Sequence, residues 1–233
     1  MLAKKHLPDI VICDVMMTGM TGIEMCQQMK SDSTVSHIPV ILLTASTSQQ
    51  VRLQGIEGGA DDYISKPFDT ELLVARVGTI LKNRHDLQRY FYNEITLQAN
   101  DFKISSEYKD FLKDCIRIVE SHLTNPGFTI KVLAAEIGMS HSTLYNRIKS
   151  ISGQSTNSFI RFIRLRRAAQ ILITTDITIS EVAYQVGIND IKYFREQFQK
   201  LFEMKPSEYV KKFRRPFHEN FQVNRDVFQN KLD

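Results

Sequence analysis

Short apolar runs alternate with amphipathic segments along the first 85 residues. Three runs are too short for helices and too continuous for strands with one exposed face, namely residues 10–13, 39–43 and 63–64. Such runs are typical of strands that are covered on both faces. Helical spacing follows each run, at residues 22–30, 49–58 and 72–80. This alternation predicts a parallel sheet with right-handed helical crossovers.

A different pattern occurs twice between residues 128 and 209. Residues 133–140 (LAAEIGMS) are echoed by residues 182–189 (VAYQVGIN), each an apolar-periodic segment, a glycine turn and a polar continuation. Each copy predicts a helix, a tight turn and a second helix. Thr178 and Glu181 form a capping-box signal for the second copy, and Asn189 or Asp190 can cap its second helix. Residues 155–173 predict a joining helix about 28 Å long.

Composition and charge restrict the class of protein. The chain has 233 residues, 42% of them hydrophobic, and no apolar run long enough for a membrane span. Cys13, Cys26 and Cys115 have no metal-site spacing, which favours a reduced cytoplasmic protein. Residues 1–85 carry 8 Lys and Arg against 9 Asp and Glu, whereas residues 110–215 carry 17 against 10. Positive charge concentrated in one domain indicates contact with nucleic-acid phosphates.

Three side chains follow the three predicted strands. They are Asp14, Thr44 and Lys66, a carboxylate, a hydroxyl and a cation. The carboxyl ends of parallel strands meet at one edge of a sheet, where sites form. An aspartate can accept a phosphoryl group, a hydroxyl can bond its oxygens, and a lysine can neutralise its charge.

The segments around these residues resemble the receiver domain of two-component response regulators. They are residues 8–17 (PDIVICDVMM), 43–45 (LTA), 58–63 (GGADDY) and 65–68 (SKPF). The resemblance implies that Asp14 is the phosphoacceptor, Thr44 the switch hydroxyl, Tyr63 the rotating switch aromatic and Lys66 the partner cation. It also implies a cis peptide bond before Pro67.

The resemblance begins part-way through the family's pattern. The family's first strand, first helix and second strand should precede Leu7, together with an acidic pair that helps to hold Mg²⁺. Asp14 and the carbonyl of Met16 alone are a poor set of ligands for this ion. We therefore expect no cofactor in this fragment, Mg²⁺ in an intact receiver, and weak or no phosphorylation of Asp14 here.

The repeated pattern resembles the C-terminal DNA-binding domain of the AraC/XylS family. The matching residues are 133–140, 179–188, Tyr193-Phe194 with Phe198, and 205–209 (KPSEY). The resemblance implies two helix-turn-helix units, each with one recognition helix. On helical spacing, the predicted base contacts are Ser142, Tyr145, Asn146, Ile191, Lys192, Arg195 and Glu196. The predicted phosphate contacts are Arg147, Lys149, Arg161 and Arg164.

We thus expect an α/β domain, an incomplete flavodoxin-like receiver with about three parallel strands, followed by an all-α domain with two helix-turn-helix units. The expected boundaries are a receiver at 1–85, a linker at 86–109, a DNA-binding domain at 110–215 and a tail at 216–233.

The function predicted from these domains is a cytoplasmic, sequence-specific transcription regulator in a phosphorelay, which is not itself an enzyme. Its expected partners are double-stranded DNA, a second copy of the chain, a histidine kinase domain as phosphodonor and RNA polymerase, with no membrane contact. Two alternatives stay open: the output end of a hybrid sensor histidine kinase, or a truncated regulator that binds DNA constitutively or in competition.

Overall fold

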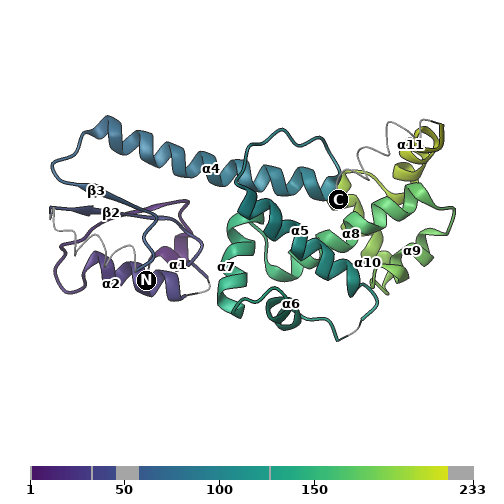
Figure 1. Ribbon diagram of the computed structural model, residues 1–233, viewed down its shortest axis with the longest axis horizontal. Helices are drawn as coiled ribbons and strands as arrows, with labels where there is room; N and C mark the ends of the chain where they lie inside the picture. The colour runs from purple at the N-terminus through teal and green to yellow at the C-terminus, as the bar shows by residue number, and fades with distance from the viewer. Residues whose placement is uncertain (1, 33, 46–57, 126, 220–233) are drawn as a thin grey trace. The chain divides into compact units, whose positions relative to one another are not determined.

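A computed structural model describes residues 2–32, 34–45, 58–125 and 127–219 (Figure 1). The contacts between residues divide the chain into two compact units. Of the described residues, the first unit contains those up to 88 together with 142–151, and the second contains those from 89 to 141 together with 152–219.

The first unit contains a parallel sheet of three strands, in the order β1-β2-β3. The strands are β1 (Val11–Asp14), β2 (Val40–Thr44) and β3 (Asp62–Ser65), and they align Val11 with Val40 and Ile41 with Asp62. Helix α2 (Gly22–Ser31) connects the first two strands, and α4 (Thr70–Thr96) follows the third. The predicted α/β pattern is confirmed. The sequence did not predict α1 (Leu2–His6), and most of the helix expected at residues 49–58 lies outside the described residues.

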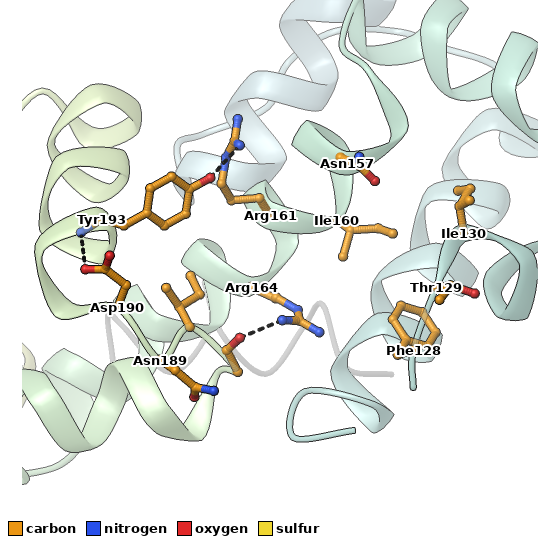
Figure 2. A pocket seen from close by; sticks show the side chains of 12 residues that line it. Phe128, Thr129, Ile130, Asn157, Ile160, Arg161, Arg164, Asn189, Asp190 and Tyr193 are labelled. Atoms are coloured by element: carbon orange, nitrogen blue, oxygen red, sulfur yellow. Dashed lines mark hydrogen bonds between the residues drawn. The ribbon is translucent and has the colours of Figure 1, made fainter. Parts of the chain in front are cut away.

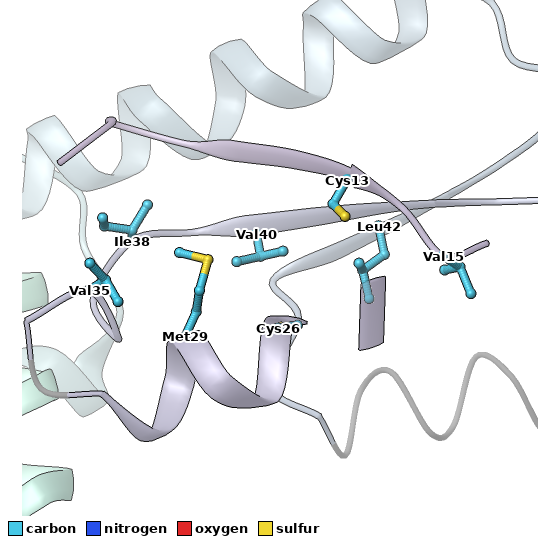
Figure 3. Packing of buried hydrophobic residues seen from close by; sticks show 8 residues of the cluster. All are labelled: Cys13, Val15, Cys26, Met29, Val35, Ile38, Val40 and Leu42. Atoms are coloured by element: carbon cyan, nitrogen blue, oxygen red, sulfur yellow. The ribbon is translucent and has the colours of Figure 1, made fainter. Parts of the chain in front are cut away.

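One apolar cluster packs α2 against the sheet (Figure 3). Cys26 and Met29 of α2 are fully buried, as are Val40 and Leu42 of β2. Burial of Met29, Val40 and Leu42 stabilises the fold by roughly 1.5–3 kcal/mol for each side chain. A capping box starts α2: the Thr21 hydroxyl accepts from the Glu24 amide at 3.2 Å, and the Glu24 carboxylate accepts from the Thr21 amide at 2.8 Å. The cap and the cluster hold the loop after β1 in place.

The second unit is helical and is built around one buried helix. Its elements are α5 (Ser106–Ser121), α6 (Ile130–Glu136), α8 (Thr156–Thr174), α9 (Ile179–Gln185), α10 (Ile191–Phe202) and α11 (Pro206–Glu219). The remaining helix, α7 (His141–Ser152), lies in sequence between α6 and α8. Phe159, Ile163 and Leu165 of α8 are fully buried. A helix that is apolar on most of its faces belongs in a core, which explains the central place of α8.

An aromatic cluster holds the last two helices together. Phe198 and Phe202 of α10 stack with ring centroids 4.4 Å apart, and Tyr209 of α11 meets Phe202 edge-on at 5.2 Å. Burial raises the pKa of Tyr209 to about 12. The Arg214 guanidinium of α11 donates to the carbonyl of Leu172 at 2.8 Å and 2.6 Å. A cation at this carbonyl stabilises the C-terminal end of α8.

The first part of the predicted linker continues helix α4. Helix α4 continues to Thr96, and its residues 89–96 belong to the second unit. Phe91 and Ile95 are buried there, at 2% and 0% exposure. Residues 97–105 alone separate α4 from α5.

Candidate phosphoacceptor site and nucleic-acid interface

The three strands bring the candidate phosphoacceptor residues to one edge of the sheet. Asp14 ends β1, Thr44 ends β2, and Lys66 follows β3. The Lys66 ammonium pairs with the Asp14 carboxylate, and the Lys66 amide donates to the Thr44 carbonyl at 2.7 Å. The Thr44 side chain is almost fully buried, at 1% exposure. The peptide bond between Lys66 and Pro67 is cis, as the resemblance implied.

Charge and hydrogen bonding keep the Asp14 carboxylate ionised. The hydrogen bond from Lys66 lowers the pKa of Asp14, and the Met16 amide, which donates to Asp14 Oδ1 at 3.1 Å, lowers it further. An ionised carboxylate is the form that can attack phosphorus. Tyr63 lies elsewhere, because its side chain packs against the apolar cluster beneath the sheet, where burial raises its pKa.

Receiver domains in general bind Mg²⁺, so the donors at this edge can be tested against that ion. Mg²⁺ requires near-octahedral coordination by oxygen. Within the described ranges there is no group of three or more His, Cys, Asp or Glu side chains that could hold a metal. Asp14 is also engaged by Lys66. These residues by themselves do not fit a Mg²⁺ site.

Both helix-turn-helix turns have the expected geometry. Gly138 follows α6 with φ of 72°, and Gly187 follows α9 with φ of 73°. Glycine adopts this left-handed conformation without steric cost. The Thr178–Glu181 capping box starts α9, and Asp190, rather than Asn189, caps α10 by accepting from the Tyr193 amide at 2.9 Å. Thr129 precedes α6 in an extended conformation but makes no side-chain cap bond.

The predicted recognition helices bury the faces that their spacing predicted. Leu144 and Ile148 of α7 are fully buried, and so are Phe194 and Phe198 of α10. The opposite face of α10 exposes Lys192, Arg195 and Glu196, with Ile191 half-buried at its start. On α7, Ser142 is exposed, while Tyr145, Asn146, Arg147 and Lys149 are half-buried.

Two of the predicted phosphate contacts are fixed to the second helix-turn-helix unit. Arg164 donates from Nη1 to the Gly187 carbonyl at 2.8 Å, and Arg161 donates from Nη1 to the Tyr193 hydroxyl at 2.9 Å (Figure 2). Burial lowers the pKa of Arg164. Both side chains are half-buried and line a pocket beside the start of α10. They therefore differ from flexible surface cations.

The sequence did not reveal the role of Arg166. This residue lies close in sequence to Arg161 and Arg164, which were predicted to contact phosphates, but Arg166 is only 6% exposed. Its guanidinium lies 3.1 Å from the Glu120 carboxylate of α5, and its Nε donates to the Glu94 carbonyl of α4 at 3.2 Å. Periodicity could have placed Arg166 on the buried face of α8, although it could not have identified these partners.

Two family models match separate parts of the chain. Residues 1–78 match the response regulator receiver domain, and residues 133–212 match a helix-turn-helix domain. The chain joins a response-regulator receiver domain to an AraC-type helix-turn-helix domain. Neither domain type is enzymatic in itself. AraC-type domains bind DNA, and receiver domains interact with histidine kinases.

Relatives match one or both halves of this receiver and helix-turn-helix chain. "Histidine kinase P4" of Formosa agariphila is 42% identical over 216 residues, which are 93% of this chain and 16% of that protein. Response regulator PleD of Caulobacter vibrioides is 46% identical over 81 residues, 35% of this chain and 18% of PleD. The solved C-terminal domain of the response regulator YesN from Fusobacterium nucleatum is 28% identical, with a TM-score of 0.37, covering 45% of this chain and 99% of that domain. The chain thus spans less than a fifth of these two relatives' lengths. No helix in the part that the structure describes is long and apolar enough to cross a membrane.

Proposed function

We propose that the chain is the receiver and output part of a transcription regulator that binds specific DNA under phosphorelay control. The observation that carries the proposal is the pair of helix-turn-helix units joined by α8, in a region with a net charge of +7. The 19 residues of α8 span about 28 Å, close to the roughly 34 Å between successive major grooves on one face of DNA.

The recognition helices differ in chemistry. At the start of α10, Lys192 and Arg195 suit guanine, Glu196 suits cytosine, and Ile191 suits the methyl group of thymine. At the start of α7, Ser142, Tyr145 and Asn146 are neutral polar residues. Asn146 suits adenine once its Oδ1 is released from the Ser36 hydroxyl, which donates to it. Arg147 and Lys149, on the same helix, are proposed to contact phosphates.

Selection of bound duplexes from a random library, followed by two substitutions, tests this function. Arg195→Ala is expected to relax the preference at one base position, because it removes a base contact. Arg147→Ala is expected to weaken selected and random DNA alike and to reduce the salt slope by about 1. Equal losses for both variants on both kinds of DNA would contradict the assignment.

Control by phosphorylation is the second part of the proposal. An Asp14 oxygen would attack the phosphorus of a phosphohistidine in a kinase domain, so that the P–N bond breaks as the P–O bond forms. Lys66 lies beside the new charge, and Thr44 would turn outward to donate a hydrogen bond. Because the described residues do not fit Mg²⁺, we predict weak or no labelling of this chain by a small phosphodonor. Strong Mg²⁺-dependent labelling that Asp14→Asn abolishes would overturn that prediction.

The chain's fit to part of a much longer protein favours one alternative. The Formosa agariphila relative is named a histidine kinase, and it matches this chain across both domains. The chain would then be the output end of a hybrid sensor kinase, with the phosphodonor in the same polypeptide. Homodimerisation and contact with RNA polymerase are further proposed steps. Sequencing the DNA upstream of the codon for Met1 tests the alternative, since an in-frame kinase domain would support it.

A further inference from the structure

A pocket of about 560 Å³ opens on the second unit beside the start of α10. Its walls come from residues 128–130, from one face of α8, from residues 187–190 and from Tyr193 (Figure 2). The first segment starts the first helix-turn-helix unit, and α8 is the joining helix. The last segment contains the turn of the second helix-turn-helix unit and the start of its recognition helix. The pocket therefore lies where all three parts of the DNA-binding domain meet.

Two cations line this pocket without a counter-ion. Arg161 and Arg164 are half-buried one turn apart on α8, and neither forms an ion pair within the described residues. Their Nε atoms are buried and have no hydrogen-bond partner in that part of the chain. Asp190 adds one carboxylate to the lining, but it is exposed and already caps α10. Two partly desolvated guanidiniums without an anion repel each other and favour a negatively charged ligand.

The two guanidiniums are held ready for such a ligand. Arg164 is fixed by its bond to the Gly187 carbonyl, and Arg161 by bonds to the Tyr193 hydroxyl and to the Ser158 hydroxyl at 3.0 Å. A guanidinium has five N–H donors, so both side chains keep donors for a ligand. Because they are already ordered, little side-chain entropy would be lost on binding.

The position of the pocket identifies the anion. In a helix-turn-helix unit the start of the recognition helix enters the major groove, while the first helix crosses the backbone. The pocket adjoins the start of α10 and the start of α6, so the backbone between two successive major grooves would pass over it. Its apolar lining by Phe128, Ile130, Ile160 and Ile188 suits the sugars on either side of a phosphate.

We propose that this pocket seats one DNA backbone phosphate between the two half-sites, held by Arg161 and Arg164. The inference rests on the proposed DNA-binding function and adds a role for the site. Arg161 and Arg164 are hydrogen-bonded to the start of α10 and to the turn before it. A bound phosphate would therefore hold the recognition helix α10 against the joining helix α8.

Single neutral phosphates test this seat directly. The full chain is titrated with its selected duplex, in which one phosphate at a time between the half-sites is replaced by a methylphosphonate. For the unchanged protein we expect a loss of about tenfold in affinity at one or two adjacent positions. In Arg161→Gln the loss at those positions should disappear, while losses at other phosphates persist. The salt slope should also fall by about 1.

Arg117→Gln is the matched control, since Arg117 lies on exposed α5 surface and the substitution removes the same charge. It should retain the full methylphosphonate profile. Thermal melting tests whether Arg161→Gln is folded. Arg161→Lys, which keeps the charge, should restore part of the sensitivity to methylphosphonate substitution. If the unchanged protein selects no duplex, the proposed function fails. If it binds its duplex but Arg161→Gln keeps an unaltered profile, the pocket assignment alone is overturned.

A titration with inorganic phosphate separates the two sources of this anion. Phosphate is added to the DNA-free chain at constant ionic strength, with chloride as the reference, and binding is measured by calorimetry. We expect no saturable binding at millimolar phosphate, because the sugars and neighbouring contacts are missing. Saturable binding that Arg161→Gln abolishes, together with a flat methylphosphonate profile, would make this a site for a free anion and overturn the DNA assignment.

Discussion

Phe91 of α4 stacks on Phe159 of α8, with ring centroids 5.2 Å apart and planes inclined by 15°. Both rings are buried, at 2% and 0% exposure. The Tyr92 hydroxyl donates to the Leu201 carbonyl of α10 at 3.3 Å. The helix that begins after the last strand of the receiver thus ends as a component of the DNA-binding core.

Phe91→Ala should destabilise the second unit by about 3–5 kcal/mol, because it removes a buried ring and leaves a cavity. Denaturant unfolding followed by circular dichroism measures the loss. Val74→Ala on the same helix is the control, since Val74 is 64% exposed and should change stability by less than about 0.5 kcal/mol. Equal effects at the two positions would show that Phe91 is not an anchor.

Arg166 joins three helices through buried charge, so breaking its pairs should be costly. Arg166→Met leaves the Glu94 and Glu120 carboxylates, with side chains 12% and 20% exposed, without their cation. We expect a loss of about 3–5 kcal/mol in the free energy of unfolding. The triple variant Arg166→Met, Glu94→Gln, Glu120→Gln should recover part of this loss, because no unpaired charge remains. A triple variant less stable than Arg166→Met would contradict the ion-pair explanation.

Local patterns predicted most of the fold, because they depend on neighbours in sequence. The period of the apolar residues located the three strands, and the glycines at 138 and 187 located both turns. The capping box at Thr178 placed the start of α9. The proximity of Asp14 and Lys66 also followed, since parallel strands bring their carboxyl ends together.

Long-range partners could not be predicted in this way. The predicted linker began at residue 86, yet residues 89–96 continue α4 and pack in the second unit, where Phe91 and Ile95 are buried. From the sequence alone, Arg161 and Arg164 were predicted to contact phosphates. Their bonds to Tyr193 and to the Gly187 carbonyl depend on the packing of α8 against the second helix-turn-helix unit.

The pKa of Asp14 should respond to Lys66. The hydrogen bond from Lys66 lowers this pKa, so Lys66→Met should move it up toward the ordinary value of 3.8. A carboxyl whose folded pKa is depressed contributes stability above its unfolded pKa, and this is lost as the pH falls through the folded pKa. The free energy of unfolding of Lys66→Met should therefore fall less than that of the unchanged chain as the pH is lowered. Carbon-detected NMR titration of the Asp14 carboxyl provides the measurement, and an unchanged pKa would rule out the pair.

Tyr209 should make the second unit sensitive to alkali. Burial raises its pKa from 10.0 to about 12, so the neutral form is favoured in the fold. The stability it contributes is present below pH 10 and is lost as the pH rises from 10 through about 12. Tyr209→Phe should remove the step at the highest pH from the phenolate titration followed by ultraviolet absorbance. It should also lessen the loss of stability in this pH range. If the variant titrates like the unchanged chain, Tyr209 is not the buried phenol.

The two turn glycines should differ sharply in their tolerance of a methyl group. Both have positive φ, 72° at Gly138 and 73° at Gly187, so alanine at either position costs about 1–2 kcal/mol in backbone strain. A Cβ at Gly138 would meet no atom within 4 Å, whereas a Cβ at Gly187 would lie 2.0 Å from the Leu123 carbonyl oxygen and 2.8 Å from Arg164 Nη1.

Gly138→Ala is therefore expected to lose only the strain energy, and Gly187→Ala more than about 4 kcal/mol, since the backbone at Leu123 must move. Chemical denaturation of both variants measures the difference. In DNA binding, Gly187→Ala should weaken base preference in the half-site read by α10, because the displaced Arg164 no longer holds the turn before that helix. Equal destabilisation of the two variants would show that the close approach at Gly187 does not position the second helix-turn-helix unit.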